Sequence, residues 1–285
     1  MKLSVALQKL NALDRRWIFI GVFVAVAVPF FIPVSFVAEP TPTTLTFDRA
    51  LGEALNRNQP IVLDVDFGPQ TMAEMEPLLQ AVLHRVFQSK RPVILLTFMT
   101  ESAAPLRTVL ARMEQTYQLR YGQDYVFLGY ASAYAYTMHG LGTSFGNYFH
   151  ADDRGTPIEK LPLMKNVHSL RDVSAVVNIA SNSFPKFWIQ YAVTPFDIDF
   201  LAGTTAVQAA EYFPFLQTGQ LKGLLGGGRA AAEYETLLLR SGVLTRRGDA
   251  TRGLGSQSLA LLVILVFIAI GNVGWLAARR AGRTS

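Results

Sequence analysis

The chain has 285 residues, of which 50% are hydrophobic and 16% are charged. It contains no cysteine, which excludes disulfides, thiolate metal sites and cysteine nucleophiles within these residues. The formal charge of +5 includes +3 in residues 1–16 and +3 in residues 279–285, so the segment between them carries −1 and offers no electrostatic match to nucleic acid.

The first apolar segment is an uncharged stretch of 21 residues, Trp17 to Val37. At about 1.5 Å per helical residue it covers the roughly 30 Å of a bilayer's hydrocarbon core, which predicts a transmembrane helix. We expect an uncleaved anchor and not a signal peptide, because cleavage after Ala38 would place Phe36 where a small side chain is required. The leucines of residues 1–16 share one helical face, which predicts an amphipathic cytoplasmic tail in the headgroup region.

The segment 47–240 alternates apolar runs with helical patterns, between two linkers at 38–46 and 241–257. Apolar runs without alternation indicate strands that are covered on both faces. The pattern therefore predicts an α/β fold, a three-layer domain with a mainly parallel sheet, whose ligands would bind beyond the carboxyl ends of the strands. The predicted strands are 61–67, 93–99, 125–128, 173–180 and 198–201, and the predicted helices are 72–88, 105–119, one from 184, and 229–239.

Asp64 and Asp66 stand two residues apart in the first strand, so they face the same side of the sheet. An apolar strand with two such aspartates, followed by glycine and threonine, resembles the first motif of the haloacid-dehalogenase-type phosphatases, which implies a nucleophile and an acid. The sequence departs from that motif, because Phe67 precedes Gly68 and the threonine arrives only at Thr71. The structural alternative is that both carboxylates cap the next helix and hold the loop through backbone amides.

The segment Gly142 to Gly146 has the spacing of a nucleophile elbow, in which glycines let a serine occupy a strained turn between a strand and a helix. Ser144 would then be the nucleophile of a serine hydrolase, with His168 as the candidate base. That fold needs several strands and helices between serine and histidine, whereas only His150 and His168 follow Ser144. The alternative is an ordinary glycine-rich loop.

The loop that contains His150, Asp152 and Asp153 brings nitrogen and oxygen donors together and is the candidate metal site, which His139 would complete. Its composition also suits a turn whose side chains are solvated. No cofactor is expected from any motif of the chain.

The segment 258–278 predicts a second transmembrane helix, with Trp275 at the interface and arginines just beyond it. Asn272 is its strongly polar side chain, and an amide that faces lipid lacks hydrogen-bond partners. We therefore expect Asn272 to lie in an intramembrane contact with the first span or with a partner. Glycines at three positions would let helices approach closely there: Gly271, Gly274 and Gly21.

Both basic tails, 1–16 and 279–285, adjoin a predicted span, which is where the positive-inside rule applies. The rule predicts a two-pass protein of the cell membrane with both termini cytoplasmic and the central domain extracytoplasmic. Four arginines in residues 240–252 oppose this orientation, but a long domain crosses the membrane largely regardless of its charge.

Aromatic residues are dense in 121–148 and in 184–215. Most must belong to the core, and the remainder predict a contact surface, because tyrosine and tryptophan are favoured at interfaces. No catalytic pattern is complete. The sequence therefore favours a non-catalytic module that binds a partner, either another membrane-protein subunit or a second copy of the chain, besides the lipid bilayer.

The alternative function is a membrane-anchored hydrolase, phosphatase-like through Asp64 and Asp66 or a serine hydrolase through Ser144. The spatial neighbourhood of these residues separates the two classes. Their convergence with His168 in one cleft would favour catalysis, and their dispersal would favour the binding module.

Overall fold

The computed structural model describes residues 15–31 and 38–281. The chain forms two compact units. One is the central segment Val37–Ala250, and the other contains the described helices near the two ends of the chain.

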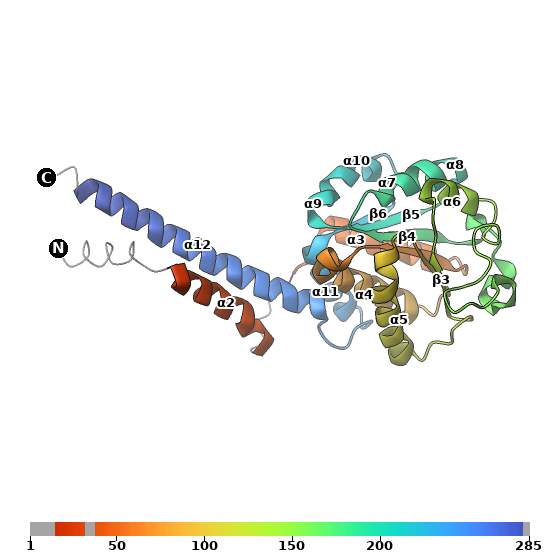
Figure 1. The fold of residues 1–285 in the computed structure, drawn as a ribbon, viewed down its shortest axis with the longest axis horizontal. Coiled ribbons are helices and arrows are strands. Elements are labelled where there is room, and N and C mark those ends of the chain that lie inside the picture. Colours follow the sequence, from red (N-terminus) through yellow and green to blue (C-terminus); the bar gives the residue numbers. More distant parts are fainter. Residues whose placement is uncertain (1–14, 32–37, 282–285) are drawn as a thin grey trace. The chain divides into compact units, whose positions relative to one another are not determined.

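The central unit is built on a sheet of six parallel strands in the order β3-β2-β1-β4-β5-β6 (Figure 1). This is the doubly wound order, in which the chain turns from one direction to the other at the boundary between β1 and β4. The predicted α/β class with a parallel sheet is therefore confirmed. The strands are β1 (Ile61–Asp66), β2 (Val93–Thr97), β3 (Tyr125–Tyr130), β4 (Ala175–Ala180), β5 (Phe200–Thr204) and β6 (Gly223–Gly226).

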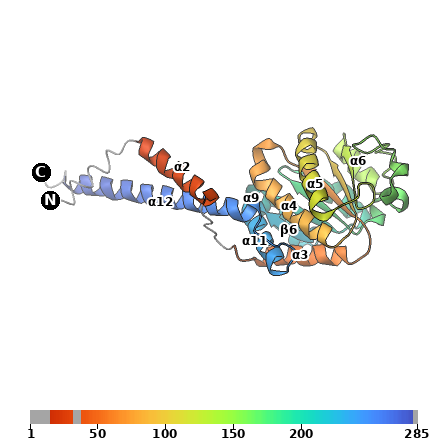
Figure 2. The ribbon, with the colours of Figure 1, turned by 90° about the horizontal axis from the view of Figure 1, so that it is seen from below.

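Helices cover both faces of this sheet (Figures 1 and 2). One face carries α4 (Met72–Gln88), α5 (Ala103–Tyr117) and α11 (Gly227–Arg240), and the other carries α6 (Tyr134–Leu141), α7 (Phe184–Trp188), α8 (Thr194–Phe196), α9 (Ala206–Ala209) and α10 (Phe213–Gln217). The short turns are η1 (Pro69–Thr71), η2 (Thr100–Ser102), η3 (Ile158–Lys160), η4 (Pro162–Asn166), η5 (Leu170–Asp172), η7 (Ala210–Tyr212) and a π-helical segment, η6 (Ile189–Val193).

The segment 38–46, predicted to be a linker, contains the start of a helix, α3 (Pro42–Leu55). Thr41 is its N-cap and accepts a hydrogen bond from the Thr44 amide at 3.5 Å, and Pro42 occupies the first turn. A threonine followed by proline is a typical helix start, because proline fixes φ and its missing amide has no partner to lose there. The composition that indicates a linker is the same composition that begins this helix.

Strand β6 was not predicted, because the sequence around it is rich in glycine, which is depleted in strands. The packing around Gly223 explains why a strand forms here in spite of its glycines. An ideal Cβ at this position would lie 2.8 Å from the Phe47 Cα, so α3 approaches the edge of the sheet only because the strand lacks a side chain there.

The start of α3 is joined to α11 by Glu233, which is 2% exposed. Its carboxylate accepts hydrogen bonds from the Thr41 amide at 3.1 Å, from the Thr41 and Thr44 hydroxyls at 2.8 Å each, and from Arg229 Nε at 3.1 Å. Burial alone would raise the pKa of Glu233, but the hydrogen bonds from Thr44, Thr41 and Arg229 outweigh it and hold the pKa below its ordinary value.

Glu233→Gln is expected to destabilise the domain by about 1.5–3 kcal/mol at pH 7, because an amide has one acceptor atom in place of two charged ones. A lowered folded-state pKa contributes stability above the ordinary glutamate pKa and loses it as pH falls through the folded value. Urea unfolding should therefore show the wild type approaching the variant at acidic pH. The exposed Glu159→Gln is the matched control, and an equal effect of both substitutions would contradict this role.

The second unit contains α2 (Arg15–Phe31) and α12 (Asp249–Ala281). Within the described residues, one helix is long and apolar enough to cross a membrane, at Asp249–Val273. The predicted second span, 258–278, lies inside α12, and this helix begins within the predicted linker 241–257. Of the predicted first span, residues 17–31 lie in α2, whose apolar part is shorter, and residues 32–37 and the tail 1–14 lie outside the described part of the chain.

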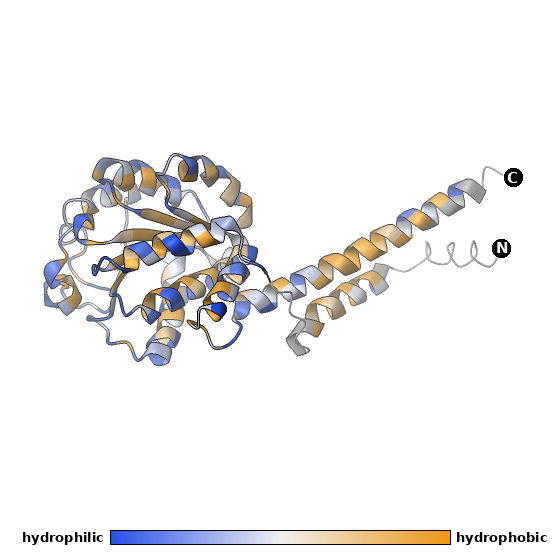
Figure 3. Cartoon of the chain, turned by 180° about the vertical axis from the view of Figure 1, so that it is seen from behind, coloured by the Kyte–Doolittle hydropathy of each residue, from blue (hydrophilic) through white to orange (hydrophobic). Residues whose placement is uncertain are grey.

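Hydrophobic residues run along both helices (Figure 3), and large apolar side chains are exposed on each, including Phe23 at 73% and Leu265 at 61%. Gly21 contacts the other helix, since an ideal Cβ there would lie 3.1 Å from the Phe267 ring. Asn272 and Gly271 are exposed in the single chain, and the surroundings of Gly274 lie outside the described part.

Candidate functional site

Asp64 and Asp66 lie in β1 on the face of the sheet that α7 covers, and both are fully buried. Asp64 Oδ2 accepts a hydrogen bond from the Trp188 indole at 2.6 Å and from Asn178 Nδ2 at 2.9 Å. Asn178 is the residue of β4 that pairs with Asp64 in the register of the sheet. Trp188 is the last residue of α7, so this aspartate connects the helix to the centre of the sheet.

Asp66 accepts three hydrogen bonds from its neighbours. Its Oδ1 receives the Phe98 amide at 2.7 Å and the Thr97 hydroxyl at 3.1 Å, and its Oδ2 receives Asn178 Nδ2 at 3.2 Å. Thus the Asn178 amide lies between the two carboxylates. We call the five fully buried side chains of this network the acid cluster: Asp64, Asp66, Thr97, Asn178 and Trp188.

Every donor in the acid cluster is neutral, and no ion pair reaches Asp64 or Asp66 within the described residues. Two adjacent buried carboxylates without a cation cannot both be ionised at low cost. Burial, and then the charge of Asp66, raises the pKa of Asp64 well above its ordinary value, and burial also raises the pKa of Asp66. The pair therefore shares one proton.

The position of that proton follows from the oxygen atoms that lack a partner. Two buried oxygens of the acid cluster, Asp64 Oδ1 and Asn178 Oδ1, have no hydrogen-bond partner in the described structure, whereas both oxygens of Asp66 accept hydrogen bonds. A proton on Asp64 Oδ1 can be donated to Asp66, which completes the hydrogen bonding of both side chains. Asp64 is thus the acid of the pair and Asp66 is the carboxylate.

Asp66 accepts a backbone amide, as the structural alternative predicts, but the amide is that of Phe98 in the loop after β2 and not one in the loop after β1. The next helix, α4, has no side-chain cap, and the loop after β1 is held by Ser102, whose hydroxyl lies 3.0 Å from the Phe67 amide and carbonyl. The carboxylates also face α7 from inside the core and line none of the described pockets.

Ser144 follows helix α6 and not a strand, and it is absent from the non-glycine residues with positive φ in the described chain. Its hydroxyl accepts the Asn147 amide at 3.3 Å. Gly142, the first glycine of the elbow pattern, is a packing position, because the Phe196 ring occupies the space that a Cβ would need. The pattern therefore describes a turn after a helix.

His168 lies beside this turn, and its carbonyl accepts the Phe145 amide at 2.7 Å. Its imidazole is exposed and forms no hydrogen bond with the described residues. The structure thus brings the segments of Ser144 and His168 together, while Asp64 and Asp66 belong to the buried acid cluster.

The loop residues proposed for metal binding already have partners. Asp152 Oδ1 accepts the amides of Arg154 at 3.0 Å and Thr156 at 2.7 Å, and its Oδ2 accepts the Tyr121 hydroxyl at 2.7 Å. Asp153 forms a bidentate pair with Arg107 at 2.7 and 2.6 Å, and His150 is exposed. Among the described residues, no group of three His, Cys, Asp or Glu could hold a metal ion.

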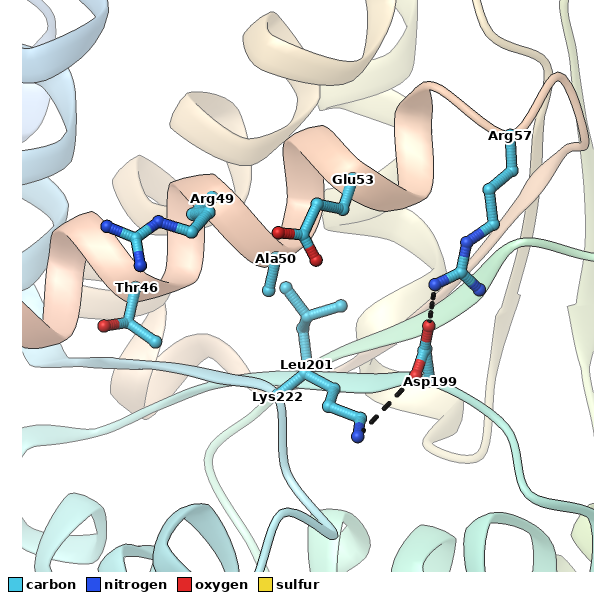
Figure 4. A pocket seen from close by; sticks show the side chains of 8 residues that line it. All are labelled: Thr46, Arg49, Ala50, Glu53, Arg57, Asp199, Leu201 and Lys222. Atoms are coloured by element: carbon cyan, nitrogen blue, oxygen red, sulfur yellow. Dashed lines mark hydrogen bonds and ion pairs between the residues drawn. The ribbon is translucent and has the colours of Figure 1, made fainter.

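A pocket of about 300 Å³ lies between α3 and the residues that precede β5 and β6 (Figure 4). Arg57 and Lys222 both reach Asp199 in it, as the dashed lines in Figure 4 show. These residues stand at the amino ends of the strands, whereas parallel sheets bind ligands at the carboxyl ends. Since Asp199 is already paired with two cations, Arg57 and Lys222, this pocket is a weak candidate for a ligand-binding site.

A set of partly exposed aromatic rings lies on and around α6. Tyr136 is 72% exposed and Tyr134 is 38% exposed. The Tyr134 ring stacks on Phe187 of α7 with 4.6 Å between centroids, and Tyr136 meets Tyr148 edge to face at 5.4 Å. These rings form two groups, Tyr134 with Phe187 and Tyr191, whose ring lies 6.4 Å from Phe187, and Tyr136 with Tyr148; we call the two groups together the aromatic surface.

The backbone beneath the aromatic surface is irregular for an identifiable reason. Pro195 has no amide, so the carbonyl of Tyr191, four residues earlier, loses its helical partner, and the chain forms the π-helical segment η6 just before it. His139 Nδ1 lies 3.2 Å from that carbonyl and, as the only possible donor of the two, links α6 to η6. His139 is thereby engaged with the backbone of η6 and is not part of a group that could hold a metal ion among the described residues.

Asn178 and Trp188 are not among the site residues predicted from the sequence, although the sequence contains a signal for Asn178. Asn178 is a polar residue within an apolar run, as Asp64 is. Polar side chains in two buried strands need hydrogen-bond partners, and each strand can supply them to the other. Trp188 lies 124 residues from Asp64 in sequence, and nothing local indicates their contact.

Comparisons with protein-family models, with curated proteins and with solved structures find no match for this chain.

Proposed function

We propose that this chain is a two-pass membrane protein whose central α/β domain is a non-catalytic module that binds a partner through the aromatic surface. The observation that carries the proposal is the exposure of Tyr134 and Tyr136 on α6, where the Tyr134 ring is held in place by stacking on Phe187 of α7. Tyrosine supplies large contact area with few rotatable bonds and is enriched at interfaces.

The geometry of the acid cluster supports a binding module over a hydrolase. A phosphatase nucleophile must reach its substrate, and a general acid must be able to exchange protons with it. Asp64 and Asp66 are fully buried, and their hydrogen-bond donors, among them Trp188, come from inside the domain. Ser144 has neither an elbow conformation nor a hydrogen-bonded histidine among the described residues.

The membrane part of the proposal rests on α12, which carries the span Asp249–Val273, and on the exposed apolar side chains of α2. We propose that the predicted span 17–37, to which most of α2 belongs, is the other crossing, with Gly21 against Phe267 and with Asn272 turned toward a partner helix. In this arrangement both termini are cytoplasmic, and the domain is extracytoplasmic.

The chain has no cysteine, so single cysteines report topology directly. We expect cysteines that replace Ser4 or Thr284 to be protected from a membrane-impermeant maleimide in intact cells, and a cysteine at the exposed Thr245 to react. All three should react after permeabilisation, which is the control for accessibility. Labelling at positions 4 and 284 without labelling at position 245 would show the opposite topology. Labelling at only one terminus would show that the chain crosses the membrane once.

Partner binding is tested by placing a photo-crosslinking amino acid at Tyr136 in cells. The expected result is one or a few discrete adducts, whose masses distinguish a second copy of the chain from another subunit. Leu45 is the control, because it is an exposed apolar residue, at 44%, outside the aromatic surface. The same adducts from both positions, or none from Tyr136, would count against the aromatic surface.

A further inference from the structure

The shared proton of the acid cluster lies at the point where α7 is fastened to the sheet. Trp188 donates to Asp64 at 2.6 Å, and this is the last residue of α7 before the π-helical segment η6. Phe187 and Tyr191, which belong to the aromatic surface, are one and three residues away along the same stretch of backbone. A change in the acid cluster therefore acts directly on the backbone that carries these rings.

We propose that the acid cluster is a proton-dependent switch, in which loss of the proton shared by Asp64 and Asp66 releases α7 from the sheet and rearranges the aromatic surface. The rearrangement is a property of the fold, and it occurs whether or not the aromatic surface binds a partner.

The surroundings of the pair leave no other way to compensate a second charge. The strands packed beside β1 contribute only neutral groups to it, Thr97 from β2 and Asn178 from β4. Helix α7, which covers this face of the sheet, contributes the Trp188 indole. The one charged residue of α7, Lys186, is paired with Glu211 at 2.5 Å. No lysine, arginine or histidine in the described chain forms an ion pair with either carboxylate.

A second buried negative charge therefore has to be hydrated or separated from the first. Below the pair lie hydrogen-bonded strands, whose opening would break the sheet. Above it lies α7, a helix of five residues that continues into the π-helical segment η6. A short helix beside a π turn has few backbone hydrogen bonds to lose, so α7 is the element expected to move.

Burial raises the pKa of Asp64 well above that of a free aspartate, so the switch operates on the alkaline side of the usual carboxylate range. Below this transition the cluster holds its proton and α7 is fixed. Above it the pair carries two charges, and water enters beneath α7. The aromatic surface is thus ordered below this transition and rearranged above it.

Trp188 itself reports this change. The chain has three tryptophans, and replacing Trp17 and Trp275 by phenylalanine leaves Trp188 as the single fluorophore in the full chain. In mild detergent between pH 5 and 9.5, we expect one reversible transition to longer-wavelength emission, with a matching rise in iodide quenching. Asp64→Asn should abolish the transition, because an amide occupies the place of the protonated acid and does not titrate.

Glu53→Gln, which removes an exposed carboxylate, is the matched control and should leave the transition unchanged. Hydrogen exchange of the Trp188 indole proton in the wild type, followed by NMR, should accelerate over the same pH range. The proposal is overturned if the wild type shows no transition, or if Asp64→Asn shows the same transition as the wild type. Failure of the crosslinking at Tyr136 leaves this result untouched, so the two proposals fail separately.

Discussion

Asp66→Asn is expected to destabilise the domain by about 2–4 kcal/mol, whereas Asp64→Asn should change its stability by less than about 1 kcal/mol. The two aspartates differ because Asp66 accepts hydrogen bonds on both oxygens and Asp64 holds the proton. The NH2 group of an asparagine at position 66 would face another donor, either the side-chain NH2 of Asn178 or the backbone amide of Phe98. An amide at position 64 keeps an acceptor for Trp188 and donates to Asp66 as the acid does.

Urea unfolding of the full chain in mild detergent, monitored by Trp188 emission in the single-tryptophan background, measures both values. The pH dependence follows from the raised pKa of Asp64, whose ordinary value is 3.8. A raised carboxyl pKa contributes stability that is complete below the unfolded-state pKa and is lost as pH rises through the folded-state pKa. The wild type should therefore lose stability relative to Asp64→Asn as pH rises from 4 to 9, and equal effects of the two substitutions would refute the shared proton.

Replacing Tyr134 and Tyr136 together by serine is expected to weaken partner binding about 30-fold or more, because a central interfacial tyrosine contributes on the order of 2 kcal/mol. Tyr134 also stacks on Phe187, so melting of the isolated chain has to accompany the measurement. Leu45→Ser, an exposed apolar position on α3, is the control and should leave binding unchanged.

The yield of the crosslinked or co-purified complex at matched expression measures this loss. A double variant that folds and still captures the partner as well as the wild type would place the interface elsewhere on the domain. Equal losses in the double variant and in Leu45→Ser would indicate a general effect of removing apolar surface.

The layers of the fold follow from local patterns in the sequence. The segments Ile61–Asp66 and Val93–Thr97 are apolar runs without alternation, and Met72–Gln88 has a helical period that buries Met75 and Leu79. A continuous apolar run indicates a strand that is buried on both faces, and a helical period indicates a helix that is buried on one face. A parallel sheet covered by helices requires both. The strand order could not be predicted in this way, because it depends on pairings between distant segments.

The missed elements violate the local preferences on which prediction rests. Strand β6 is built around glycines because α3 approaches Gly223 too closely for a side chain, and the approach is tertiary. The π-helical segment η6 depends on Pro195 together with His139 from another helix. In both cases a distant contact determines the backbone, so the signal is absent from the segment itself.

The candidate site was predictable in its residue types and not in its geometry. Asp64 and Asp66 were expected to face one side of the sheet, and they do. Their partners Asn178 and Trp188 come from β4 and α7, far along the chain, and these partners place the pair in the core and not in a cleft. The exposure of Tyr136 was likewise undetermined, because an aromatic residue in a dense run fits the core and the surface equally well.

The most direct test of the central claim is the mass of the complex that the full chain forms when it is extracted in a mild detergent. If the domain binds a partner through the aromatic surface, we expect the wild type to form an assembly larger than one chain in its micelle. Ser144→Ala and Asp64→Asn should leave this assembly intact, and the double substitution Tyr134→Ser, Tyr136→Ser should disrupt it. A wild type that extracts as a single chain would contradict the account, as would phosphate-ester or carboxyl-ester turnover that the wild type shows and Asp64→Asn or Ser144→Ala loses.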